Sequence, residues 1–324
     1  MQVAILMYHY VRDFSLPGAP ALKGLDVRNF ERQIDLVGSV CRFVSIDDVI
    51  EAWSGGKPLP DRAVLLSFDD GYSDHFHYAF PVLRKRGIRG AFYPTAETVL
   101  DGKVLDINKI HFLLAAHPDP EPLISHIRSY LTAAGPSSGL PSFDEIWNEI
   151  AHDGKFDPAN IIFLKGCLQY ALPEEVRREL VQELFLRYSE VSETDLASEL
   201  YLSREMMREM HEAGMHFGNH SVTHKWLSFL SQKELEEEVD GGLEMLDAVG
   251  VNSDRWTMCY PFEGPTEEAR ERITDCLRSR GCALALSAET EVADSSKHDR
   301  LLMPRLDTSD VPREPDAVTR MFHA

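Results

Sequence analysis

Two adjacent carboxylates follow an apolar run in the first quarter of the chain. Residues 65–71 read LLSFDDG, so Asp69 and Asp70 stand where a buried strand would end. Neighbouring carboxylates repel each other, and burying either one is costly unless a positive charge compensates it. The pair is therefore either a polar turn, since Asp-Gly is a common turn dipeptide, or part of a site that holds a cation.

A second group of candidate ligands lies in the sequence GNHSVTH. His220 and His224 are four residues apart, so both rings can reach one ion from a helical turn or a tight loop. His216 forms another pair of the same spacing with His220, and the spacing alone does not say which two histidines bind. Because the chain contains 13 histidines, such a pair also arises by chance, and structural histidines are the alternative.

Together, the carboxylates and the histidines make a coherent set for metal chemistry. Two imidazoles and one carboxylate leave coordination positions open, which suits Zn²⁺, Co²⁺, Mn²⁺ or Fe²⁺. A second carboxylate beside the ion could accept a proton from water, and the ion would keep both acids ionised near neutral pH. This interpretation predicts that Asp70 binds the ion and that Asp69 acts as a base.

The surrounding sequence has the alternation of strands and helices expected of an α/β fold with a mainly parallel sheet. Apolar runs predict strands, and amphipathic spacing predicts helices between them; these elements are strands at 2–10, 43–44, 64–68 and 89–93, and helices at 28–40, 46–53 and 78–86. In such sheets, ligands bind beyond the carboxyl ends of the strands, where the carboxylates and the histidine pair would meet.

A largely helical block interrupts this pattern at residues 105–201 and includes an amphipathic helix at 173–188. The α/β pattern then resumes, with predicted strands at 215–220, 256–260 and 282–286 and helices at 203–213, 232–249 and 266–280. The acidic run at 234–240 is interpreted as a solvated helix face.

Composition restricts the possible partners and the compartment. The chain has 324 residues and a formal net charge of -20, which argues against non-specific binding to nucleic acid or anionic membranes. The first residues, MQVAILMYHYV, are too short to span a bilayer and lack the features of a signal peptide, which predicts a cytoplasmic protein without a transmembrane segment. The five cysteines contain no CxxC pair and fit reduced thiols. The oligomeric state is left open.

The two motifs resemble those of a known family. SFDDG at 67–71 and HSVTH at 220–224 are similar to the [TS]FDDG and H[ST]xxH motifs of the polysaccharide deacetylases, also called NodB-homology or carbohydrate esterase family 4 enzymes. The likeness extends over roughly residues 1–100 and 203–310. It implies a single deacetylase domain over 1–324 with a distorted (β/α) barrel of about seven strands, and a helical insertion or cap at 101–202.

The resemblance also implies roles for individual residues. Asp69 corresponds to the general base, and Asp70, His220 and His224 correspond to the ligands of one divalent transition metal. The expected ion is Zn²⁺, with Co²⁺, Mn²⁺, Ni²⁺ or Fe²⁺ as alternatives. Such an ion polarises the acyl carbonyl and activates water for hydrolysis of the amide.

The third motif of the family departs from its usual form. Where the family has R-x-P-[YF], this chain has Cys259, Tyr260, Pro261 and Phe262. The arginine that would orient the base is missing there, and Arg255 or Arg305 could replace it in space. A backbone N–H near Tyr260, Pro261 and Phe262 would stabilise the oxyanion, and Trp226 is the best candidate for stacking on a sugar.

The late L-x-H motif, which usually provides the general acid, is also missing, because His298 lies in the polar sequence SSKHDR. However, Tyr8-His9-Tyr10-Val11 resembles the N-terminal Y-H-x-[IV] of a branch of the family in which this histidine stands at the start of the chain. His9 is therefore predicted as the general acid, and a core histidine bonded to the backbone is the alternative.

These interpretations predict a metal-dependent hydrolase that removes an acetyl or formyl group from an amino sugar. The helical block and the missing export signal favour a small substrate, such as a nucleotide- or lipid-linked glycan intermediate. Two alternatives remain at this stage: an amidohydrolase acting on cyclic amides or ureides, and a degenerate homologue that binds glycan without cleaving it.

Overall fold

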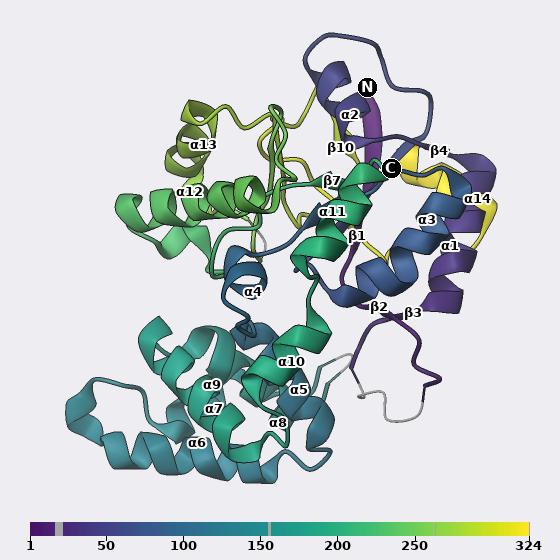
Figure 1. The fold of residues 1–324 in the computed structure, drawn as a ribbon. Helices are drawn as coiled ribbons and strands as arrows, with labels where there is room; N and C mark the ends of the chain where they lie inside the picture. Colours follow the sequence, from purple (N-terminus) through teal and green to yellow (C-terminus); the bar gives the residue numbers. More distant parts are fainter. Residues whose placement is uncertain (17–21, 155–156, 263, 324) are drawn as a thin grey trace. The chain divides into compact units, whose positions relative to one another are not determined.

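The computed structural model describes residues 1–16, 22–154, 157–262 and 264–323. The chain forms two compact units (Figure 1). The barrel unit comprises residues 1–16, 23–103 and those from 197 onward, and the helical unit centres on residues 104–196. The interpretation of the whole chain as one domain with an insertion at 101–202 stays a prediction.

A closed ring of parallel strands forms the centre of the barrel unit. Within the described residues the ring has seven strands: β1 (Gln2–Tyr8), β5 (Ala63–Asp69), β6 (Ala91–Tyr93), β7 (His216–Phe217), β8 (Thr257–Cys259), β9 (Leu284–Leu286) and β11 (Leu306–Asp307). β1, β5, β6 and β7 pair in this order, and β8 pairs with β9. Isolated parallel bridges join Asn219 to Met258 and Leu286 to Met303, and the pairing of β11 with β1 closes the ring.

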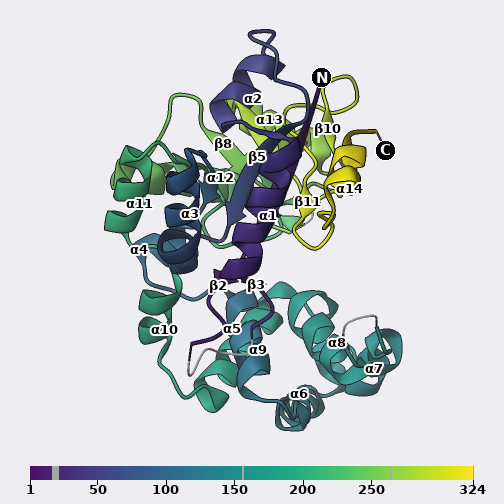
Figure 2. The ribbon, with the colours of Figure 1, turned by 90° about the vertical axis from the view of Figure 1, so that its right-hand side faces the viewer.

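The fold class is therefore confirmed as a distorted (β/α) barrel of seven strands, and the distortion lies at the two single-bridge joints. Short strands lie outside the ring: β4 (Arg42–Phe43) pairs with β5, β10 (Ala293–Asp294) pairs antiparallel with β1, and β2 (Val11–Arg12) pairs with β3 (Leu25–Asp26). Figure 2 shows β1 and β5 side by side, as their six-residue register requires.

Strand β5 is buried along its whole length, as expected for a parallel strand covered on both faces. Its side chains alternate between two apolar clusters. Phe68 packs with the helices outside the ring, including Phe30, whereas Leu65 packs with Ile5 and residues of β9. Asp69 is four residues after Leu65, so its side chain lies on the same face of the strand and points inward at the carboxyl end.

The helices predicted for the barrel unit are present and surround the strands. They are α1 (Val27–Val40), α2 (Ile46–Trp53), α3 (Phe80–Arg86), α11 (Arg204–Glu212), α12 (Gln232–Val249) and α13 (Arg270–Ser279). Two short helices of this unit, α4 (Ala96–Leu100) and α14 (Pro315–Arg320), were not predicted. The helix expected at 78–86 is preceded by a π-helical turn, His75–Ala79, and ends at Gly87 in the left-handed region (φ 66°). Helices α12 and α13 pack side by side (Figure 1).

The helical unit contains α5 (Asp106–Ala116), α6 (Glu121–Ala134), α7 (Phe143–Ile150), α8 (Ala159–Gly166) and α9 (Glu174–Tyr188), and α10 (Glu193–Leu200) leads back to the barrel unit. The amphipathic helix predicted at 173–188 is confirmed as α9, which packs on α5. Over the described parts of both units, no helix has the length and apolar character needed to cross a membrane.

Candidate metal centre and active site

The turn after β5 explains why two aspartates and a glycine stand together. Asp70 adopts a left-handed conformation (φ 68°), which Asp tolerates better than most residues. Gly71 follows with φ 68°, and a Cβ added there would lie 2.6 Å from Pro94 Cβ. Because the chain turns so tightly, both carboxylates stay buried, with Asp69 2% and Asp70 4% exposed.

The second motif forms a loop that helix α12 holds in place. The carboxylate of Glu238 accepts hydrogen bonds from the backbone N–H groups of Val222 (2.8 Å) and Thr223 (2.9 Å). Asn219 Oδ1 accepts another from the Ser221 N–H at 2.8 Å. The interpretation of the whole acidic run 234–240 as a solvated face is therefore wrong for Glu238, which is buried and has paired backbone donors.

Two glycines in α12 let this loop approach the helix closely. A Cβ on Gly242 would lie 2.0 Å from Asn219 Oδ1, and one on Gly241 would lie 2.5 Å from a methyl group of Val222. Glycine within a helix costs about 1 kcal/mol relative to alanine. The loop that carries His220 and His224 could not approach α12 so closely with larger residues at these positions, which explains why glycine stands there despite its cost.

The ligand atoms of Asp70, His220 and His224 converge. Both histidine Nε2 atoms lie 3.4 Å from Asp70 Oδ1, and all three ligand atoms lie within 4.8 Å of one another. Two donors that are each about 2.1 Å from one ion in a tetrahedral site lie about 3.4 Å apart. Asp70 Oδ1 is also buried without a hydrogen-bond partner among the described residues. The three residues therefore fit a divalent metal.

Neighbouring groups fix the orientation of two of these ligands. The Nδ1–H of His220 donates to the Cys259 carbonyl at 2.8 Å, which leaves the Nε2 lone pair for an ion. The hydroxyl of Tyr72 donates to Asp70 Oδ2 at 2.6 Å, which leaves Oδ1 facing the histidines. Tyr72 was not predicted as a site residue, and its position two residues after Asp70 was the only available indication.

Asp69 is paired with the buried Arg305. Arg305 Nη1 lies 2.8 Å from Asp69 Oδ1, and its Nε donates to the Ser287 carbonyl at 2.8 Å. Burial opposes ionisation of Asp69, but Arg305, together with His220 and His9, lowers its pKa to about 2. Of the two arginines that the sequence offered for the missing motif arginine, the structure brings Arg305 to this position, whereas Arg255 lies on the surface near Asp47 (3.9 Å).

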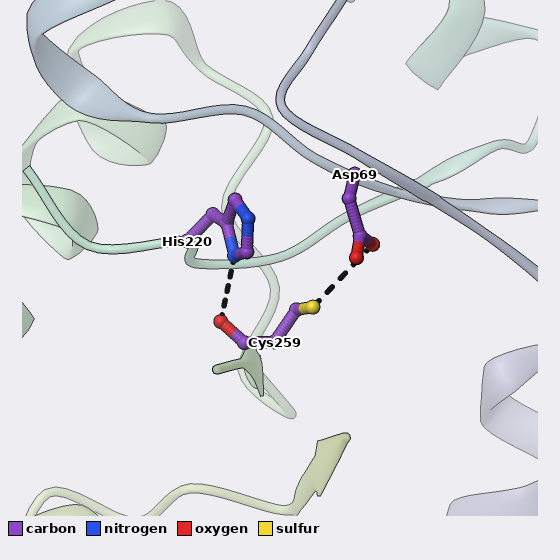
Figure 3. A group of neighbouring side chains, drawn as sticks. All are labelled: Asp69, His220 and Cys259. Carbon is purple, nitrogen blue, oxygen red and sulfur yellow. Dashed lines mark hydrogen bonds between the residues drawn. The ribbon is translucent and has the colours of Figure 1, made fainter. Parts of the chain in front are cut away.

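Cys259, which occupies the place of the motif arginine, also faces Asp69. Figure 3 shows it between Asp69 and His220: its thiol lies 3.4 Å from Asp69 Oδ1, and its carbonyl accepts the hydrogen bond from His220. Burial raises the pKa of this thiol, so it stays protonated at neutral pH. A nucleophilic role is not supported.

His9 lies on the other side of Asp69. Its Nε2 is 3.9 Å from Asp69 Oδ2, and its side chain is 43% exposed. This exposure does not fit the alternative of a core histidine. The backbone carbonyl of His9 accepts a hydrogen bond of 2.8 Å from the buried His75, which fixes the start of the loop after β1.

Two other histidines considered in the sequence have structural contacts. His216 lies in β7 as expected, and its Nε2 hydrogen-bonds Thr257 Oγ1 at 2.8 Å. His298 accepts a hydrogen bond from the Asp294 N–H at 2.9 Å in a surface loop and lies 3.3 Å from Glu291. The pair that meets Asp70 is therefore His220 and His224.

The residues of the altered third motif have different roles: Tyr260 makes structural hydrogen bonds, whereas Phe262 lies beside the candidate ligand His224. The Tyr260 N–H donates to the Leu286 carbonyl and its hydroxyl to the Leu301 carbonyl, both at 2.9 Å, so Tyr260 has no free donor for an oxyanion. Pro261 has no N–H. Phe262 is 39% exposed, and its ring lies 5.0 Å from that of His224 and 5.7 Å from that of Trp226. Because the Tyr260 N–H is already paired and Pro261 has none, Phe262 is the residue among these three that can contribute a backbone donor.

Comparison with known proteins agrees with this geometry. The model of the polysaccharide deacetylase family matches residues 56–117 and 182–277, which contain both motifs. Over these two segments, which make up just under half of its residues, the chain is similar to the polysaccharide deacetylase family. Carbohydrate N-deacetylation is the reaction class of this family. The match includes residues 104–117 and 182–196 of the helical unit, for which the sequence resemblance gave no counterpart.

Individual relatives share with this chain either a short segment or the fold. The poly-beta-1,6-N-acetyl-D-glucosamine N-deacetylase of Escherichia coli K12 is 54% identical over 41 residues, 13% of this chain, and the chain spans only 6% of that relative's length. Streptococcus pyogenes deacetylase PplD has a TM-score of 0.58 at 15% identity, covering 99% of this chain and 98% of its own. IcaB from Ammonifex degensii has a TM-score of 0.56 at 18% identity, covering 100% and 97%. These structures share the fold.

Proposed function

We propose that this chain is a metal-dependent N-deacetylase that removes acetyl groups from an N-acetylated glycan. The observation that carries the proposal is the convergence of three ligand atoms from Asp70, His220 and His224 next to a second buried carboxylate, Asp69. A metal with open positions beside an ionised carboxylate is the arrangement needed to hydrolyse an amide with water.

In this proposal each residue has a separate task. The bound ion, for which Zn²⁺ is our first choice, would polarise the amide carbonyl and acidify water. Asp69, kept ionised by Arg305, accepts a proton from the attacking water at Oδ2. His9 lies 3.9 Å from that oxygen and delivers a proton to the departing amine nitrogen as the C–N bond breaks. The Phe262 N–H is the candidate donor to the developing oxyanion.

The substrate we propose is a polymeric or oligomeric glycan. The name of the E. coli relative specifies a polymer of N-acetyl-D-glucosamine. The comparisons do not support the small nucleotide- or lipid-linked substrate predicted from the sequence. They also do not favour action on cyclic amides or the non-catalytic alternative, and an acetyl group takes precedence over a formyl group for the same reason.

The test combines metal analysis with amine release. We expect about one transition metal per untagged chain, lost in Asp70→Ala and His220→Ala but kept in His77→Ala, a control at an exposed histidine. We expect amine release from N-acetylglucosamine oligomers by the wild type, and metal binding without amine release by Asp69→Asn. Full activity of Asp69→Asn would contradict the assignment of the base. Absence of metal after addition of Zn²⁺, Co²⁺ or Mn²⁺ would contradict the proposal as a whole.

A further inference from the structure

A series of contacting aromatic rings leads away from the candidate metal centre. It begins at the ligand His224, whose ring centroid lies 5.0 Å from that of Phe262. Phe262 stacks on Trp226 at 5.7 Å, and Trp226 contacts Phe229 edge-to-face at 5.2 Å. Phe262, Trp226 and Phe229 are called the aromatic platform below. It ends at Phe229, which is 72% exposed.

The platform is held firmly by its surroundings. The Trp226 indole N–H donates to the Gly264 carbonyl at 2.9 Å, and Ser228 Oγ accepts from the Thr266 N–H at 2.9 Å. On either side of Phe229, Leu227 and Leu230 are buried in the cluster beneath helices α12 and α13. Phe229 therefore stays exposed on an anchored turn whose neighbouring apolar side chains point inward.

The backbone at Phe262 indicates that its ring position matters. Phe262 has φ 58°, a left-handed conformation that bulky residues rarely adopt and that costs about 1 to 3 kcal/mol. This conformation places a half-exposed ring between His224 and Trp226, where it joins the metal centre to the rest of the platform.

We propose that the aromatic platform binds successive sugar rings of a neutral glycan chain whose N-acetyl group reaches the metal centre. This inference rests on the proposed function and specifies its substrate as an extended glycan. The C–H face of a pyranose packs on an aromatic ring, and fixed aromatic side chains provide such contacts at little entropic cost. The ring centroids of neighbouring platform residues lie 5.2 and 5.7 Å apart, which is comparable to the width of one sugar ring. The platform therefore extends beyond a single bound sugar.

Charge supports a neutral glycan as the occupant. The chain carries a formal net charge of -20, which repels anionic carriers such as nucleoside diphosphates. The same field attracts the ammonium groups that deacetylation leaves on a glycan chain. A glycan polymer that is neutral before deacetylation and cationic after it therefore fits this protein better than a phosphorylated monosaccharide does.

The test compares variants of Phe229 at increasing substrate length. Binding of β-1,6-linked N-acetylglucosamine, from monosaccharide to pentasaccharide, is measured by calorimetry on the metal-loaded full chain carrying Asp69→Asn, which prevents turnover. We expect affinity to rise with length. Adding Phe229→Leu, which keeps an apolar side chain but removes the ring, should weaken pentasaccharide binding about two- to tenfold and leave monosaccharide binding unchanged. Phe229→Trp should retain the length dependence, and the control Leu100→Ala, at a 37% exposed apolar residue, should match the parent.

Several outcomes would overturn the inference. Affinity that does not rise with length, or equal pentasaccharide binding with and without Phe229→Leu, would show that the platform does not bind sugars. A change in sedimentation caused by Phe229→Leu without any change in sugar binding would show instead that the platform is a protein–protein contact. Length-dependent binding without amine release by the chain with Asp69 intact would contradict the proposed function alone, whereas amine release without a Phe229 effect would contradict only the platform.

Discussion

The buried pair of Arg305 and Asp69 allows a quantitative test of how the site is held together. The two side chains are 1% and 3% exposed and lie 2.8 Å apart. Replacing Arg305 with methionine keeps an unbranched apolar stem but leaves the Asp69 carboxylate buried without its cation. Breaking a buried pair in this way costs about 3 to 5 kcal/mol. We expect Arg305→Met to lower the free energy of unfolding by this amount, a large share of the 5–15 kcal/mol typical of folded proteins.

The assay is urea unfolding of the metal-free protein, followed by tryptophan fluorescence. Arg255→Met is the matched control, because Arg255 is 55% exposed and lies 3.9 Å from Asp47; its effect should stay within about 0.5 kcal/mol. Combining Asp69→Asn with Arg305→Met should recover part of the loss, because no buried charge remains unpaired. Equal losses for the two arginine variants, or no recovery in the double variant, would refute the reasoning.

Three further predictions concern residues that support the ligands. Tyr72→Phe removes the donor to Asp70 Oδ2 but keeps the ring stacked on Tyr10, and should weaken metal affinity about 10- to 100-fold in competition with a chromophoric chelator; unchanged affinity would contradict this role. Glu238→Ala should lower unfolding stability by about 2 to 3 kcal/mol, against a negligible effect of Glu237→Ala on the same helix; similar values for both would count against it. Gly242→Ala should lower the melting temperature despite the better helix propensity of alanine, and an increase would show that the loop can move away.

The local features of the barrel unit were predictable because they depend on short stretches of sequence. The apolar run before Asp69 and the amphipathic spacing of α1 each identify an element without knowledge of the rest of the chain. The two-residue strands β10 and β11 carry no usable periodicity, so the closure of the barrel was not visible in the sequence. Glu238 was misread because an acidic run on a helix looks the same whether one of its members points to solvent or to a buried loop.

The sequence offered Arg305 and Arg255 as partners of Asp69 but could not choose between them for a related reason: Arg305 and Asp69 are 236 positions apart, and only barrel closure brings them together. Cys259 on β8 and Arg305, just before β11, both face Asp69 Oδ1, because side chains from different strands converge inside a closed ring. An arginine that pairs with the base can therefore come from the position of Cys259 or from that of Arg305. The absence of an arginine from the third motif is no support for a degenerate homologue. The same holds for the late histidine, since His298 pairs with a surface loop while His9 lies 3.9 Å from Asp69. In this fold, departures from a linear motif must be judged by which side chains meet inside the barrel.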